Sequence, residues 1–200
     1  MKPPPILPFK RVVFAAACIP AVALVYDAFT GNLTANPVDY ITDETGDWTI
    51  TFLMISLAVT PLRRLTRWNE IIKLRRMLGL FAFFYASLHL LTWIVLVSFF
   101  DVPTMLVDIS MRPFITIGMA TFLILLALAV TSNRAAIRRL GRRWQQLHRL
   151  VYLAAVGAVI HFWWLVKADI TLPRRWAVTL AVLLGFRVWW MLRTRTSLRS

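Results

Sequence analysis

The strongest constraint on this chain is a series of apolar runs, each close to the length of a membrane-spanning helix. A helix of about 20 residues rises about 30 Å, which matches the hydrocarbon core of a bilayer. Hydrophobic residues make up 59% of the sequence, well above the share in soluble domains. The sequence therefore predicts an all-α integral membrane bundle of six transmembrane helices. The expected spans are 9–29, 48–61, 77–100, 113–130, 147–166 and 173–192.

The six spans form one predicted domain over residues 9–192, with a proline-rich lead at 1–8 and a basic tail at 193–200. The prolines argue against a helix in the lead, and Pro61 is expected to kink or end the second span. The first span also resembles a signal peptide, with Cys18 at a position that suggests lipoprotein cleavage. Because the apolar run continues well past Cys18, we expect an uncleaved membrane helix instead.

The formal net charge of +14 is divided unevenly between alternate loops. Lys and Arg gather near both ends of the chain and in 63–76 and 134–149, whereas most acidic residues lie in 39–47 and 101–108. Cytoplasmic loops carry the excess of Lys and Arg, so we expect both termini in the cytoplasm. The charge then reflects topology, with anionic membrane lipid as its contact, and we expect no nucleic acid partner.

Two of the three histidines lie deep inside predicted spans. His89 follows Arg76 by 13 residues and His161 follows Arg149 by 12 residues, and both of these helices are expected to run outward. Each histidine should therefore lie about 18–20 Å along its helix, at similar depth in the outer half of the membrane. This placement suits axial ligation of one haem by two neighbouring helices. The alternative is that each histidine only forms a hydrogen bond to a neighbouring helix.

The third histidine, His148, lies at the cytoplasmic boundary of the fifth span, roughly 140° around an ideal helix from His161. It is a candidate for a second metal or cofactor site, or a histidine that only meets water and lipid headgroups. Arg75 and Arg76 are candidates to pair a haem propionate, a flavin phosphate or a quinone headgroup, or are simply solvated. Arg187, inside the sixth span, is expected to extend to the cytoplasmic surface.

Several classes of protein are disfavoured by what the sequence contains. A single cysteine, Cys18, argues against a disulfide, an iron–sulfur centre or a structural zinc site. No G-x-G-x-x-G sequence indicates a nucleotide-binding fold. A cofactor-free transporter or structural subunit stays open, although we see no convincing internal repeat and few intramembrane carboxylates. A self-contained ferric or quinone reductase is also open, and its donor would be a quinol or a separate reductase.

Four segments carry a resemblance to a known family: RRMLGL at 75–80, ASLHL at 86–90, MRPFITIG at 111–118 and LGRRWQQLHRLVY at 140–152. Together with 60–62 and 160–164, they resemble the haem-binding membrane subunits of the bacterial protein-methionine-sulfoxide reductase system (the MsrQ, or YedZ, family). The resemblance covers nearly the whole chain. It is carried by the combination of a Trp-Gln-Gln-Leu-His sequence and a second histidine 13 residues further on.

The resemblance implies a ferric-reductase-like transmembrane domain in the inner membrane of a Gram-negative bacterium, with haem b and FMN as cofactors. It further implies electron flow from the quinone pool to a periplasmic molybdopterin-containing catalytic subunit, which reduces methionine sulfoxide in oxidised envelope proteins. The chain itself would hold no methionine sulfoxide site and no catalytic residue. Related ferric reductases and NADPH oxidases use four histidines for two haems. Here Arg75, Arg76 and Met77 stand where a partner for His148 is expected, which puts a second bis-histidine haem in doubt.

Overall fold

The computed structural model describes residues 6–196, and all regular secondary structure within them is helical. The elements are α1 (Ile6–Thr30), α2 (Pro37–Thr66), η1 (Asn69–Lys73), α3 (Leu74–Thr92), η2 (Trp93–Val97), α4 (Val102–Met111), α5 (Pro113–Val130), α6 (Arg134–Leu140), α7 (Arg142–His148), α8 (Leu150–Leu165) and α9 (Thr171–Thr196). The short segment η1 is a 3-10 helix, and η2 continues α3 as a π-helix.

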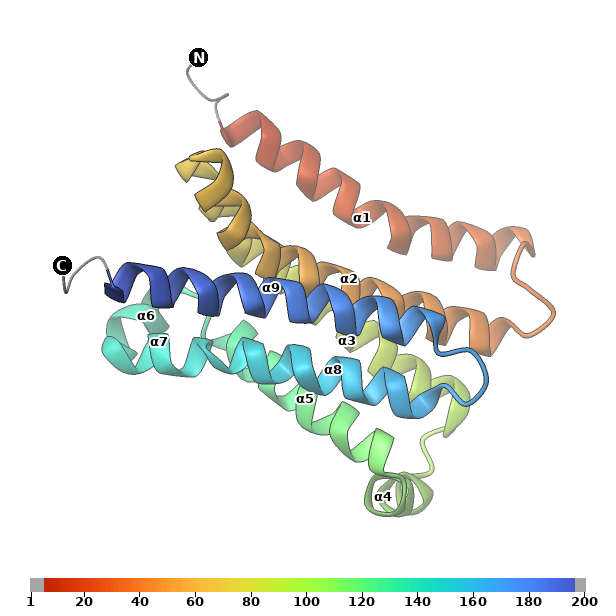
Figure 1. The fold of residues 1–200 in the computed structure, drawn as a ribbon. Helices are drawn as coiled ribbons and strands as arrows, with labels where there is room; N and C mark the ends of the chain where they lie inside the picture. The colour runs from red at the N-terminus through yellow and green to blue at the C-terminus, as the bar shows by residue number, and fades with distance from the viewer. Residues whose placement is uncertain (1–5, 197–200) are drawn as a thin grey trace.

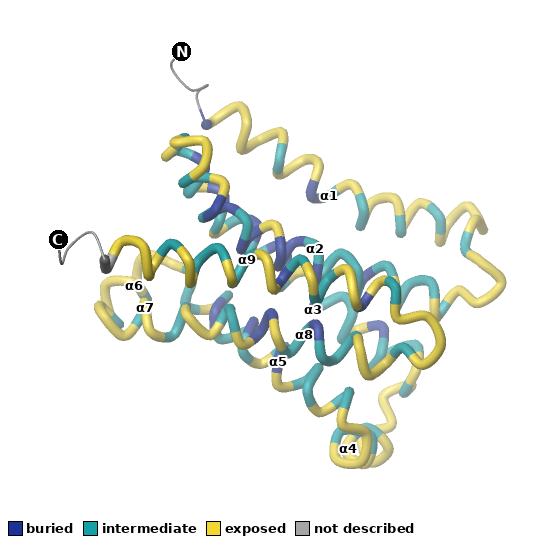
Figure 2. Tube along the Cα trace, viewed as in Figure 1, coloured by how far each residue is buried: buried dark blue, intermediate teal, exposed yellow. Residues whose placement is uncertain are grey.

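The long helices α1, α2, α3, α5, α8 and α9 form one elongated bundle (Figure 1). The helix α1 begins and α9 ends at the same end of that bundle. Burial is concentrated where α2 and α3 face the other helices, whereas α1 lies at the edge and is mostly exposed (Figure 2). Most exposed side chains on the long helices are apolar, as expected for surfaces that meet lipid.

Five helical stretches within residues 6–196 are long and apolar enough to cross a membrane, whereas six were predicted. They are Ile6–Thr30, Asn69–Val97, Pro113–Val130, Arg142–Leu165 and Thr171–Thr194. The remaining long helix, α2, has 30 residues but carries Asp39, Asp43, Glu44 and Asp47 in its first half. Its apolar second half, from Trp48 onward, is the segment in which the second span was expected.

The helix boundaries agree best with the prediction for the fourth span, since α5 occupies Pro113–Val130. The acidic segment 37–47 was predicted to be a loop but belongs to α2, because the Asn36 side chain caps the backbone N–H of Asp39 and Pro37 begins the helix. Residues 6–8 of the proline-rich lead already belong to α1, and α9 extends into the basic tail as far as Thr196. The predictions for residues 1–5 and 197–200 fall outside the described residues.

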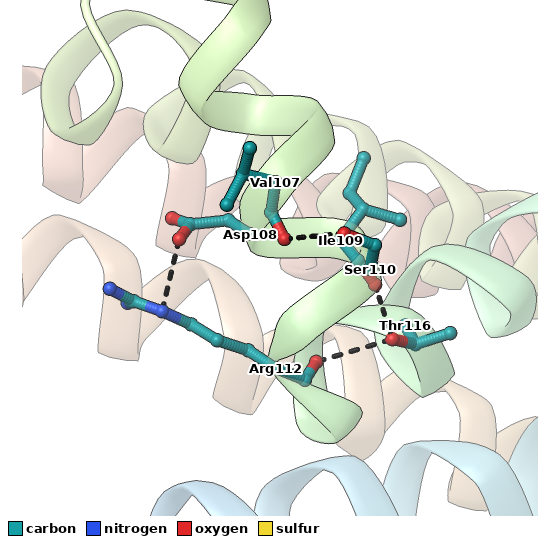
Figure 3. A network of polar contacts seen from close by, with 6 residues as sticks. All are labelled: Val107, Asp108, Ile109, Ser110, Arg112 and Thr116. Carbon is teal, nitrogen blue, oxygen red and sulfur yellow. Dashed lines mark hydrogen bonds and ion pairs between the residues drawn. The ribbon is translucent and has the colours of Figure 1, made fainter.

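The predicted loop between the third and fourth spans contains a further helix, α4, which lies across the N-terminal end of α5 (Figure 1). Asp101 caps it by accepting hydrogen bonds from Thr104, and these bonds lower the pKa of the Asp101 carboxyl. At its other end, Asp108 pairs with Arg112 at 3.0 Å (Figure 3). The Thr116 hydroxyl of α5 donates to the carbonyl groups of Ile109 and Arg112, which fixes the corner between the two helices.

Pro61 does not end α2, because a side chain from another helix satisfies the carbonyl that the proline leaves free. A proline has no N–H, so the Leu57 carbonyl one turn earlier loses its helical partner. The guanidinium of Arg187 on α9 donates to that carbonyl at 2.8 Å. Arg187 therefore turns into the bundle, and the prediction that it extends to the cytoplasmic surface is wrong.

A second proline, Pro20, lies inside α1, and a side chain of α3 bonds to the backbone beside it. The phenol of Tyr85 donates to the Ala17 carbonyl at 2.8 Å and accepts from the Ala21 N–H at 3.1 Å. In an unbroken helix those two backbone groups would bond to each other. The buried Tyr85 hydroxyl thus bridges these two backbone groups beside Pro20 and attaches the loosely packed α1 to the bundle.

Replacing Tyr85 with Phe is expected to destabilise the protein by about 1–3 kcal/mol, because it leaves two backbone groups unsatisfied in an apolar setting. In a Pro20→Ala background the cost should shrink, since Ala17 and Ala21 can then bond directly. Thermal unfolding in detergent measures both differences. Tyr26→Phe is the control, because that side chain is 63% exposed. Equal losses in the two backgrounds would contradict the proposed bridging.

Candidate functional site

The structure brings His89 of α3 and His161 of α8 together, as their predicted depths required. Their ring centroids are 6.1 Å apart, and the ring planes are nearly perpendicular at 84°. Both side chains are half-buried inside the bundle. Two residues 72 positions apart in the sequence therefore form one facing pair, and no described charged side chain bonds to either ring.

Each ring has one nitrogen engaged by a backbone carbonyl. His89 Nδ1 lies 3.0 Å from the Thr42 carbonyl of α2, and His161 Nδ1 lies 2.7 Å from the Phe114 carbonyl of α5. A carbonyl oxygen only accepts, so each Nδ1 must carry the hydrogen, which leaves Nε2 as the nitrogen with a free lone pair. Metal-ligating histidines are commonly oriented in this way.

The two contacts repeat in the chain at a fixed offset. In both halves the histidine follows its carbonyl partner by 47 residues, and a glycine lies one helical turn after that carbonyl. Thr42, Gly46 and His89 therefore correspond to Phe114, Gly118 and His161 with a shift of 72 residues. The sequence showed no convincing repeat because the correspondence rests on a few contacts. With the same shift, His148 corresponds to Arg76.

The two glycines make room for the imidazole rings. A Cβ at Gly118 would lie 2.8 Å from Cε1 and Nδ1 of His161, and a Cβ at Gly46 would lie 3.2 Å from the same atoms of His89. Any larger residue would push the ring away from its carbonyl partner. The sequence reasoning missed both positions, because a lone glycine in an apolar helix does not reveal which side chain approaches it.

This pair fits a haem better than a metal ion held by protein alone. Within residues 6–196, no group of three or more His, Cys, Asp or Glu side chains could hold a metal. Two imidazoles could supply two protein ligands to a haem iron, whose other ligands come from its own macrocycle. The ring centroids are 6.1 Å apart, which is close enough for both imidazoles to reach one metal at metal–nitrogen distances of about 2.0–2.1 Å.

His148 lies in a separate site as the last residue of α7. Its Nε2 lies 3.1 Å from the Thr131 hydroxyl, and Trp144 stacks on its ring at 3.9 Å. Trp144 is itself held by a hydrogen bond to the Thr131 carbonyl at 2.9 Å. The helix is interrupted at Arg149, between α7 and α8, so an ideal helix does not relate His148 to His161. The structure does not bring His148 to the other two histidines.

The two candidate arginines face different surroundings. Arg75 is half-buried and acts electrostatically on His148, whereas Arg76 is exposed. Arg75 also acts on Arg187, which bonds to the Tyr152 hydroxyl of α8. Sequence reasoning gave no role to Tyr152 or Thr131, although Tyr152 closes the segment that carries the family resemblance.

The family described as "Ferric reductase like transmembrane component" matches residues 45–159, which include His89 and His148 and end two residues before His161. The chain therefore belongs to that family of membrane proteins, and more narrowly to the MsrQ group of proteins within it.

Curated relatives define the narrower group. The protein-methionine-sulfoxide reductase heme-binding subunit MsrQ of Herminiimonas arsenicoxydans is 48% identical over 97% of this chain and 90% of its own length. The same subunit of Ralstonia nicotianae is 47% identical over 96% of this chain and 91% of its own, and that of Bordetella pertussis is 46% identical over 92% and 91%. No solved structure matches the chain.

Gly118→Ala is expected to destabilise the protein by about 1–3 kcal/mol, because the added methyl group displaces His161 from the Phe114 carbonyl. Gly185→Ala is the matched control, since a Cβ there meets nothing within 4 Å. In a helix that change alone should stabilise by up to about 1 kcal/mol. Unfolding midpoints in detergent should therefore move in opposite directions, and a neutral Gly118→Ala would disprove the close approach.

Proposed function

We propose that this chain is the haem b electron-transfer membrane subunit of a protein-methionine-sulfoxide reductase, with His89 and His161 as the axial ligands. The observation that carries the proposal is the facing pair of imidazoles, each with Nδ1 held by a carbonyl and Nε2 left free. The printed names of the relatives, which are heme-binding subunits, support it.

A bound haem supplies one-electron redox chemistry, and the residues of this chain set the conditions for it. The Thr42 and Phe114 carbonyls fix the orientation of the imidazole rings. They also make each Nε2 a stronger lone-pair donor to a metal. The apolar surroundings favour the form of the site with less net charge. The chain needs no methionine sulfoxide site for this role, because it passes electrons to a partner.

The proposed electron path runs from the quinone pool to a periplasmic molybdopterin-containing catalytic subunit that repairs oxidised envelope proteins. We place the chain in the bacterial inner membrane, with α2 as a sixth span and both termini in the cytoplasm. The six long helices of the bundle and the positive loops at one side support this topology. The histidine pair then lies in the outer half of the membrane, near the partner.

The cytoplasmic side is proposed as the place where electrons arrive. There the half-buried Arg75 acts electrostatically on His148, and its positive charge suits an anionic cofactor, for which we propose FMN. Thr131 and Trp144 orient His148 toward this role. A second haem with two histidine ligands is not proposed, since Arg76 stands at the position equivalent to His148.

Replacing His89 or His161 with Ala should lower haem content per chain by more than about tenfold, since either change removes an axial ligand. His148→Ala is the control, because that residue lies in the separate site. The measurement is the dithionite-reduced absorption spectrum of purified protein, with extracted haem quantified against chain. Wild-type haem content in a folded His89→Ala or His161→Ala variant would overturn the ligand assignment.

Arg75→Gln should slow haem reduction by a soluble quinol analogue while leaving the dithionite-reduced spectrum unchanged. The half-buried Arg75 contributes to the positive field at the cytoplasmic site, whereas Arg76 is exposed and screened by solvent. Arg76→Gln is therefore the matched control. Stopped-flow absorbance measures both rates. Equal rates for the two variants would show that Arg75 has no specific role in haem reduction by the quinol.

A further inference from the structure

An apolar groove runs along the outside of α8 and α9. Val156 and Ile160 of α8 and Ala177, Ala181 and Leu184 of α9 line it, and its volume is about 210 Å³. No polar atom is exposed in its lining. Such a groove accepts a hydrocarbon chain from the surrounding membrane.

A polar pair lies one helical turn beyond the cytoplasmic end of this groove. Tyr152 precedes Val156 by four residues and Arg187 follows Leu184 by three, so both continue the stripes that line the groove. The guanidinium of Arg187 donates to the Tyr152 hydroxyl and lies 4.9 Å above its ring. The two residues therefore form the polar end of an otherwise apolar channel.

Several hydrogen-bond donors at this pair have no acceptor within residues 6–196. The Tyr152 hydroxyl accepts from Arg187, and its own hydrogen meets no described acceptor. Arg187 Nε is buried without a partner, and so is the hydroxyl of Thr60, one turn along α2 from Leu57. No carboxylate acts on Arg187, and the charged groups that do are Arg64 and Arg75. The site is therefore rich in donors and poor in acceptors.

The depth of Tyr152 and Arg187 in the membrane indicates which kind of ligand head group they can bind. Arg187 precedes Arg193 by six residues, and its partner Leu57 precedes Arg63 by the same number, which is about 9 Å along each helix. A lipid phosphate lies outside the hydrocarbon core. A ligand whose head group reaches this pair must therefore have a head group that is stable inside the hydrocarbon core. An uncharged head with carbonyl oxygens satisfies both the depth and the surplus of donors.

We propose that the groove between α8 and α9 is the binding site for a membrane quinone, with its head at Tyr152 and Arg187 and its isoprenoid tail along Ala181 and Ile160. The Tyr152 hydroxyl donates to one carbonyl oxygen of the head. Tyr152 and His161 share α8 and lie about 14 Å apart along it. The inference rests on the proposed function, for which it supplies the site of the electron donor.

The test measures binding directly, with a short-tailed quinone titrated into purified protein and quinone retained from the membrane quantified after extraction. Tyr152→Phe should weaken binding about three- to tenfold, through loss of one hydrogen bond. Ala181→Phe should fill the groove and weaken binding by more than roughly tenfold. Val182→Phe is the matched control, since that neighbouring side chain is 64% exposed on the lipid face. Arg187 is left intact because it also supports α2.

Unchanged quinone binding in Tyr152→Phe and Ala181→Phe would overturn the site. If wild-type haem is reduced by quinol and both variants are reduced equally well, the proposed function stands and only the site is wrong. If wild-type haem is not reduced by quinol at all, the proposed function itself fails. Phosphatidylglycerol is quantified in the same extracts, and its loss in the variants with quinone unchanged would assign the groove to a phospholipid and overturn the inference.

Discussion

The structure depends on one constraint, that every backbone N–H and C=O inside hydrocarbon must find a partner within the protein. Two prolines interrupt that pairing, and a side chain from another helix bonds to the backbone beside each of them. Tyr85 of α3 bridges two backbone groups of α1 beside Pro20, and Arg187 of α9 satisfies the carbonyl that Pro61 leaves free in α2. The prolines therefore connect helices, because each break creates a polar site that only a neighbouring helix can fill.

The histidine pair uses the same backbone chemistry for another purpose. Each imidazole reaches a helix carbonyl through space that a glycine one turn later keeps open. The carbonyl fixes the tautomer, and the other nitrogen keeps its lone pair. The recurrence of this arrangement after 72 residues indicates that α2–α3 and α5–α8 are equivalent halves around one site. The halves differ near the starts of α3 and α8, where one presents Arg76 and the other His148.

Positive charge gathers at one end of the bundle, whereas the long helices present apolar surface. Arg75 connects the His148 site to the Arg187–Tyr152 pair electrostatically. Along the chain, Tyr152 precedes His161 by nine residues, or about 14 Å of helix, and His148 precedes it by 13. The hydrogen-bond donors at Tyr152 and Arg187 are thus separated along the bundle from the proposed haem ligands. This separation supports the proposed direction of electron flow, from the cytoplasmic side outward.

The sequence by itself determined the helical class, most of the long helices and the equal depth of His89 and His161, because hydropathy and a rise of about 1.5 Å per residue are local properties. It misjudged the start of α2, the helix α4 and the direction of Arg187, since caps and inward hydrogen bonds depend on neighbours. Only the tertiary structure showed which carbonyl meets which imidazole, and that Gly46 and Gly118 allow it. Those contacts join segments 47 residues apart, and no local pattern in the chain encodes such a distance.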